Sequence, residues 1–212
     1  MSRVWPRLWK YRRSARLCHA PDLRVSQETT RPVQSYKGDV GPHHTALRFS
    51  LEHLLTRQGF WIEGDPPSVQ QPLIVACNHP TARDALYLSV AIPVPVTLIE
   101  PALLPGRAAL ARRTCDLVQD DSHGGVRDFG AQILGARKVL VVFPENQLEP
   151  AGLGEFKLWT AQLALKTGVP LLPAAMDLSE GRCLRFGDEI RPDGEADALT
   201  ATLREAMVAL GA

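Results

Sequence analysis

The 212-residue sequence has few cysteines and little excess charge, and both shortages exclude classes of protein. Its four cysteines lie far apart and form no C-x-x-C pair. That spacing favours reduced thiols in a cytosolic compartment over a disulfide framework or a zinc site. The formal net charge is only +1 at pH 7, which gives no reason to expect nucleic acid as a partner.

Long apolar runs are also lacking. A membrane-spanning helix needs about 18 or more consecutive apolar residues. The nearest candidate, "LYLSVAIPVPVTLI" at 86–99, is interrupted by Pro93 and Pro95. The first twenty residues have no apolar central region of the kind that marks a secretory signal peptide. We therefore expect a cytoplasmic protein that contacts membranes from one side.

Residues 1–40 differ in composition from the rest of the chain. The start, "RVWPRLWKYRRSARL", mixes Trp5, Trp9 and Tyr11 with arginines, and a polar stretch with Pro and Gly follows it. Indole rings favour the headgroup region of a bilayer, and basic side chains are attracted to anionic lipids. This composition predicts an N-terminal extension and linker that lies on the inner face of the cell membrane. The alternatives are a disordered basic tail, or residues upstream of the natural start.

The second part of the chain, 41–212, alternates apolar runs typical of strands with segments of helical period. We expect helices over 45–58, 80–92, 104–113, 126–137, 155–168 and 196–210, and strands over 60–64, 73–77, 96–100, 115–119, 138–145, 169–176 and 183–190. Alternation of this kind predicts a single α/β domain with a largely parallel central sheet flanked by helices on both faces. Functional residues in such sheets gather at the carboxyl ends of the strands.

The stretch "LIVACNHPTARDAL" at 73–86 places a histidine at one of those ends, with an aspartate five residues later. His79 and Asp84 could form a pair in which the carboxylate orients the imidazole as a general base. The pattern alone is a weak signal, since His123 and Asp128 have the same spacing in a segment that resembles a loop. A hydrogen-bonded structural histidine at the end of a strand explains His79 equally well.

Further motifs give this pair a context. Asn78, His79 and Asp84 match an N-H-x4-D block, and Phe143, Pro144 and Glu145 match the start of an F-P-E-G-T-R block. A V-P-hydrophobic-P block follows at 169–173, and "LRFGDEI" comes after it. In this order, the blocks resemble the glycerolipid acyltransferase family, typified by 1-acylglycerol-3-phosphate O-acyltransferases. The resemblance covers roughly 45–210.

The resemblance implies an O-acyltransferase of lipid synthesis or remodelling. His79 would be the general base and Asp84 its orienting carboxylate. The acyl donor would be acyl-CoA or acyl-carrier protein and the acceptor a lysolipid, with neither a cofactor nor a metal. The remaining residues that we expect to bind substrate are Asn78, Arg83, Phe143, Pro144, Glu145, Asn146 and Lys157. For Arg83 and Lys157 a solvent-exposed position without a role is an equal alternative, and we expect Glu145 to act structurally or on the acceptor rather than as an acid or base.

The chain departs from the family at two arginines associated there with the acceptor's phosphate. Leu148 occupies one position and Asp121 the other, while Asn146 stands where the family has glycine. Asparagine can adopt the left-handed conformation that glycine usually serves, so we expect the turn to persist. An aspartate repels a phosphate monoester that an arginine fork would bind. The acceptor is therefore expected not to be lysophosphatidic acid, but a substituted lysophospholipid, an aminolipid or a glycolipid.

Two other functions remain open from the sequence. Cys77 lies two residues before His79 on the same strand, so a thioesterase or ester hydrolase with a cysteine nucleophile is one alternative. The other is a non-catalytic lipid-binding relative, because the two family arginines are missing.

Overall fold

The protein is described here from a computed structural model, which places residues 42–67, 72–81, 83–92, 94, 96–100, 116–119, 125–135, 138–147, 149, 152–177 and 182–212. The predicted extension at 1–40, the predicted helix at 104–113, and the positions of Asp121, His123 and Leu148 lie outside these residues.

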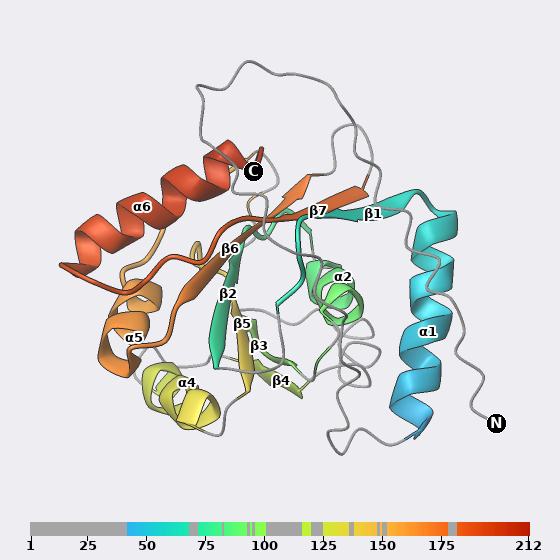
Figure 1. Cartoon of the computed structure of the whole chain (residues 1–212), viewed down its shortest axis with the longest axis horizontal. Helices are drawn as coiled ribbons and strands as arrows, with labels where there is room; N and C mark the ends of the chain where they lie inside the picture. Colours follow the sequence, from blue (N-terminus) through green and yellow to red (C-terminus); the bar gives the residue numbers. More distant parts are fainter. Residues whose placement is uncertain are drawn as a thin grey trace.

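In the described residues, seven strands form one sheet in the order β1-β7-β6-β2-β5-β3-β4 (Figure 1). Every neighbouring pair is parallel except β6 and β7, so the predicted largely parallel sheet is confirmed. The strands are β1 (Phe60–Glu63), β2 (Leu73–Cys77), β3 (Val96–Glu100), β4 (Asp116–Gln119), β5 (Val139–Val142), β6 (Leu171–Asp177) and β7 (Arg182–Phe186).

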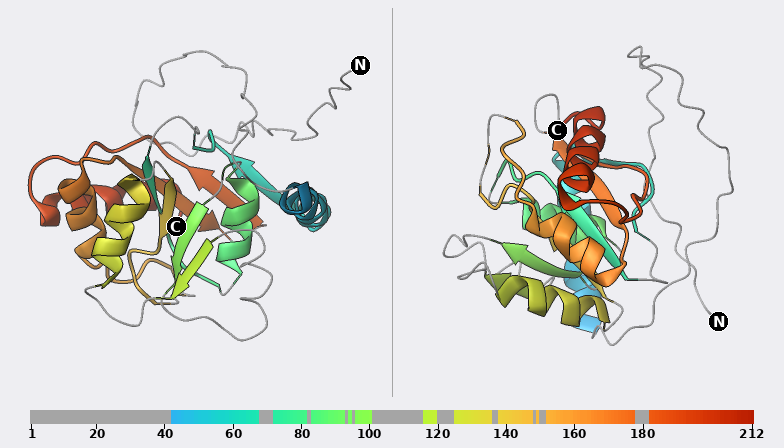
Figure 2. Two further views of the ribbon diagram at one scale, coloured as in Figure 1. Left: turned by 90° about the horizontal axis from the view of Figure 1, so that it is seen from below. Right: turned by 90° about the vertical axis from the view of Figure 1, so that its left-hand side faces the viewer.

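Helices cover both faces of this sheet, as the sequence predicts (Figure 2). The described helices are α1 (Pro42–Arg57), α2 (Asp84–Ala91), α4 (Gly125–Gly135), α5 (Trp159–Thr167) and α6 (Ala196–Ala209). Helices α1 and α2 pack in one apolar cluster on one face, while α4, α5 and α6 pack in a second cluster on the other. The fold is therefore a three-layer α/β arrangement.

Strand β2 lies between β5 and β6 and is buried along its whole length. Leu73, Val75 and Cys77 face the cluster with α1 and α2, whereas Ile74 and Ala76 face the cluster with α4, α5 and α6. A strand covered on both faces needs apolar residues at every position, which explains the continuous run "LIVAC". The residues that follow β2 are consequently held at a fixed point on the carboxyl edge of the sheet.

Two helices begin later than the sequence predicts. The helix expected to open at Pro80 begins at Asp84, because Asp84 N–H donates to the carbonyl of Thr81 in a preceding turn. The helix expected from 155 begins at Trp159. Before α2, helical periodicity continues through residues that form a turn, and apolar spacing alone cannot separate the two. Before α5, the N–H of Lys157 donates instead to the carbonyl of Pro144, in the loop after β5.

Gly64, directly after β1, gives a test of how tightly the outer strands are joined. Its φ is +80°, and a Cβ added there would lie 2.4 Å from the carbonyl oxygen of Phe186 on β7. We expect Gly64→Ala to lower the free energy of unfolding by about 2–4 kcal/mol, from the left-handed backbone and the backbone clash together. The measurement is urea denaturation followed by circular dichroism.

Gly59→Ala is the matched control for that substitution. Gly59 has nearly the same φ, +81°, but nothing lies within 4 Å of the added Cβ. It should lose only the backbone contribution, about 1–2 kcal/mol. Equal losses in the two variants would show that the contact between Gly64 and Phe186 is not what restricts this position.

Candidate active site

His79 and Asp84 form the predicted pair at the carboxyl end of β2. The Nδ1 atom of His79 lies 3.2 Å from Oδ2 of Asp84, the first residue of α2. Both side chains are almost fully buried, with exposed fractions of 1% and 0%. A carboxylate in this position accepts the Nδ1 proton and leaves the basic lone pair on Nε2. The pair therefore has the geometry of an oriented general base.

The carboxylate of Asp84 is itself held by Thr81. The backbone N–H of Thr81 donates to Oδ2 at 2.7 Å, and the Thr81 hydroxyl donates to Oδ1 at 2.6 Å. Both carboxylate oxygens of Asp84 are thus held by Thr81, independently of the contact with His79. Sequence reasoning missed Thr81, although Thr81 and Asp84 form a T-x-x-D pattern, the spacing at which a carboxylate near a helix start accepts the backbone N–H three residues before it.

Phe143 fixes the imidazole from one face. The rings of His79 and Phe143 are stacked, with centroids 4.0 Å apart and planes inclined by 20°. Phe143 follows β5 and is 1% exposed. It was predicted to bind substrate, and in the structure it packs on the predicted base. Such a contact restricts rotation of the imidazole about its side-chain torsions.

Glu145 joins the main chain of His79 to a second loop. Its Oε2 accepts the backbone N–H of His79 at 2.9 Å, and its Oε1 accepts the backbone N–H of Gly154 at 3.0 Å. Burial raises the pKa of Glu145, although both N–H donors act in the opposite direction. Both oxygens of Glu145 thus hold backbone groups, while the expected role of Glu145, structural or on the acceptor, stays a prediction.

The loop after β5 contributes further main-chain contacts. The N–H of Glu149 donates to the carbonyl of His79 at 3.0 Å, and the N–H of Lys157 donates to the carbonyl of Pro144 at 2.8 Å. Asn146 has φ +58°, the left-handed conformation predicted for it. The turn that glycine serves in the family therefore persists here with asparagine.

Arg83 and Lys157 are exposed, and no described contact links either side chain to His79. Nζ of Lys157 forms an ion pair with Glu155 at 3.0 Å. An ion pair between exposed groups contributes little energy. Contact of these two cations with an anionic acceptor stays a prediction.

Asn78 uses both polar atoms of its side chain within the sheet. Its Nδ2 donates to the carbonyl of Met176 at 3.1 Å, and its Oδ1 accepts the N–H of Met176 at 2.6 Å. The predicted contact of Asn78 with substrate stays a prediction, whereas its contact with β6 is a feature of the fold.

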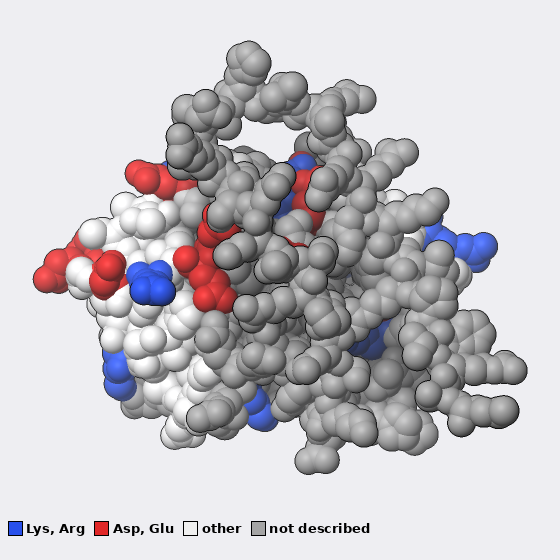
Figure 3. All heavy atoms as spheres, in the orientation of Figure 1, with Lys and Arg blue, Asp and Glu red and all other residues white. Residues whose placement is uncertain are grey.

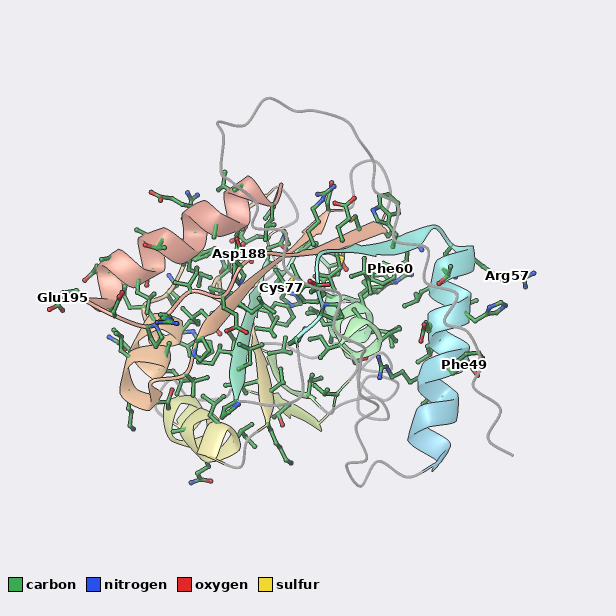
Figure 4. All side chains as sticks on the ribbon, viewed as in Figure 1. Phe49, Arg57, Phe60, Cys77, Asp188 and Glu195 are labelled. Atoms are coloured by element: carbon green, nitrogen blue, oxygen red, sulfur yellow. The ribbon has the colours of Figure 1, made fainter. Side chains whose placement is uncertain are left out.

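Cys77 lies at the end of β2, where Figure 4 labels it, and it is fully buried. Burial raises the pKa of its thiol well above the usual value, and the carboxylates of Asp84 and Glu145 raise it further. The thiolate is the nucleophilic form of cysteine. A cysteine hydrolase centred on Cys77 is thus disfavoured by the electrostatics of its surroundings.

A shallow groove of about 780 Å³ borders the loop that carries Gly154. It lies between this loop and α6, and its described lining includes neither His79 nor Asp84. Within the described ranges, no group of three or more His, Cys, Asp or Glu side chains could hold a metal ion.

Comparison with known proteins places the chain in a family. The acyltransferase family model matches residues 52–177, which include His79, Asp84 and Glu145. The fold is similar to the crystal structure of the 1-acyl-sn-glycerophosphate (LPA) acyltransferase PlsC from Thermotoga maritima, with a TM-score of 0.61 and 19% sequence identity over 78% of this chain and 79% of that one. None of the curated proteins matches the chain. The matched region exceeds half of the sequence, so the chain belongs to the acyltransferase family, as its resemblance to the glycerolipid acyltransferases predicted.

Proposed function

We propose that the protein transfers a fatty acyl group from acyl-CoA or acyl-carrier protein to a hydroxyl of a lysolipid, with His79 as general base. The observation that carries this proposal is the contact between His79 and Asp84 at the carboxyl end of β2. In the reaction, Nε2 of His79 takes the proton of the acceptor hydroxyl while the oxygen attacks the thioester carbonyl. The C–S bond then breaks, and the thiolate leaves with the proton returned by His79.

The burial of His79 bears on which acceptor reaches it. With the ring 1% exposed, bulk water does not reach the base. A site that excludes water favours transfer to an alcohol over hydrolysis, because water competes for the same acyl group. The proposal therefore requires that substrate binding displaces contacts around the ring and brings the hydroxyl to Nε2.

The acceptor is inferred from two departures of the sequence from the family pattern and from one acidic residue that contacts the main chain of His79. Leu148 and Asp121 replace the two arginines that the family associates with phosphate. Glu149, whose N–H bonds to the carbonyl of His79, adds a half-buried acidic residue to the same loop. These acids disfavour a phosphate monoester. A substituted lysophospholipid, an aminolipid or a glycolipid with a free hydroxyl is the acceptor that we propose.

The test is incubation of the protein with labelled acyl-CoA or acyl-carrier protein and a panel of these acceptors, with products identified by mass spectrometry. We expect acylated product with at least one substituted acceptor and at least about tenfold less with lysophosphatidic acid, as loss of one arginine–phosphate contact implies. Cys77→Ser should keep the activity. Release of free fatty acid that depends on Cys77 would support the hydrolase, and lysolipid binding without turnover would support the lipid-binding relative.

The protein is further proposed to work at the inner face of the cell membrane. No helix in the described part of the chain is long and apolar enough to cross a bilayer. Helix α1 exposes Phe49 (70%) and Leu54 (49%), and Arg57 projects outward from its end (Figure 4). Acidic side chains instead gather over α6 and the segment before it (Figure 3), namely Asp188, Glu189, Asp193, Glu195, Asp197 and Glu205. The α1 side is thus the better match for an anionic lipid surface.

Removal of residues 1–40 tests this location. We expect the shortened chain to bind anionic vesicles at least about tenfold more weakly, because each basic residue near the surface contributes about 1 kcal/mol. Sedimentation with vesicles rich in anionic lipid gives the measurement, and neutral vesicles provide the control. Unchanged binding to the anionic vesicles would exclude residues 1–40 as the anchor.

A further inference from the structure

The chain must leave the sheet between Cys77 and His79, and the way it does so points to a role for Asn78. The parallel ladder between β2 and β6 pairs Ala76 with Pro173 and Cys77 with Ala174. If this ladder continued by one residue, the backbone of Asn78 would form the next hydrogen bonds with β6. Instead β2 ends at Cys77, and the next contact with β6 is made by a side chain.

The amide of Asn78 acts in place of a backbone unit. It donates to the carbonyl of Met176 and accepts the N–H of the same residue, so it occupies both backbone groups that β6 presents there. Met176 is 2% exposed, and water cannot replace these bonds. Two buried backbone groups without partners would cost several kcal/mol. The fold thus depends on an amide side chain at this position.

The main chain of His79 is held from the opposite side, by the loop after β5. Its N–H donates to Glu145 and its carbonyl accepts from Glu149. The peptide unit that carries the imidazole is therefore fixed between β6, through Asn78, and the loop after β5. Loss of either attachment lets the end of β2 shift relative to Asp84.

We propose that Asn78 is a positioning residue for acyl transfer, whose side-chain amide replaces the next rung of the β2–β6 ladder and so sets the place of His79. This inference rests on the proposed function, in which His79 is the base. It differs from the expectation that Asn78 contacts substrate, because its two polar atoms are directed at Met176.

The first test is Asn78→Ala in a steady-state assay. A shift of the base by about 1 Å is enough to reduce the rate about 100-fold. We expect kcat to fall by about that factor with KM changed less than about twofold, since Asn78 does not bind substrate in this proposal. A rise in KM with kcat unchanged would instead identify a substrate contact, and no change in either would overturn the inference.

Asn78→Asp provides a sharper test that does not depend on removing the side chain. A neutral carboxylic acid has an O–H donor and a carbonyl acceptor, which are enough for the two bonds that the amide makes to Met176, whereas the ionised form has no donor for the carbonyl of Met176. Burial favours the neutral acid. The activity of this variant relative to wild type should therefore rise at least about tenfold as the pH falls from 8 to 6, by ordinary titration. The ionisable groups near this position are Cys77, whose Sγ lies 3.6 Å from Oδ1 of Asn78, and the linked residues His79, Asp84 and Glu145, all of which are present in both proteins.

Gln132→Glu is the matched control, since it makes the same chemical change on the exposed surface of α4 and should show no such dependence. The two hydrogen bonds between the side chain of Asn78 and the backbone of Met176 can also be tested without an activity assay, by hydrogen exchange at the amide of Met176. We expect the amide of Met176 to be protected from exchange in the wild type and to lose this protection in Asn78→Ala. A wild-type protein inactive with every acceptor would contradict the proposed function alone. Unchanged protection at Met176 in Asn78→Ala would contradict the proposed role of the Asn78 side chain in holding the end of β2.

Discussion

Replacing His79 with alanine is expected to lower kcat for acyl transfer by about 10³-fold or more. General base catalysis by a positioned side chain contributes about 10² to 10⁴ in rate, and His79 is the side chain that Asp84 and Phe143 hold in place. The measurement is the initial rate of thiol release from acyl-CoA in the presence of an acceptor that the wild-type protein uses.

The loss of rate in His79→Ala can be assigned to the missing imidazole, because the loop after β5 bonds to the main chain of residue 79 and not to its ring. The N–H bonded to Glu145 and the carbonyl bonded to Glu149 are kept in alanine, and only the ring stacked on Phe143 is lost. A melting curve should show a folded protein with reduced stability. His53→Ala, on the exposed side of α1, is the control and should keep full activity. More than a tenth of the wild-type rate in His79→Ala would exclude His79 as the base.

The sheet could be predicted because its strands carry their own signals. The run at 73–77 is apolar at every position, which is what burial on both faces demands, and the alternation of strands and helices predicts parallel pairing. The place of His79 at a carboxyl end followed from that. The pair with Asp84 was also predictable, since the two residues are close in sequence and meet across one turn.

The contacts that support this pair could not be predicted in the same way. Asn78 and Met176 are 98 residues apart, and Glu145 and His79 are 66 residues apart, so each contact depends on which strands become neighbours and in which register. A parallel sheet built from separate crossovers leaves that order open in the sequence. The predicted start of α2 was wrong for a local reason. Thr81 and Asp84 form a hydrogen-bonded turn, and the residues of this turn continue the helical period.

Asp84→Ala is the second substitution with a large expected effect, a fall in kcat of about 10³-fold. It leaves Nδ1 of His79 without the carboxylate that fixes its proton, and it leaves the N–H and hydroxyl of Thr81 without their acceptors. The base then loses both its orientation and the charge that stabilises the imidazolium formed in the reaction. The same rate assay measures the loss, with a melting curve to confirm that the variant folds.

Asp84→Asn separates those two losses, because Thr81 determines how the new amide is oriented. The Oδ2 position must accept both from the Thr81 N–H and from His79, whereas the Oδ1 position meets only a hydroxyl, which can accept as readily as it donates. The amide therefore places its oxygen at Oδ2 and its NH₂ at Oδ1, and the histidine keeps its tautomer. We expect kcat to fall by only about 10²-fold, from the missing charge alone, within the range of general base effects. Thr81→Ala keeps the backbone N–H that orients the amide and removes only the hydroxyl, so we expect it to lower the rate less than about tenfold both in the wild type and in Asp84→Asn. The effects in this cycle should therefore be nearly additive, whereas strong coupling would mean that the hydroxyl of Thr81, and not its N–H, controls the orientation of residue 84.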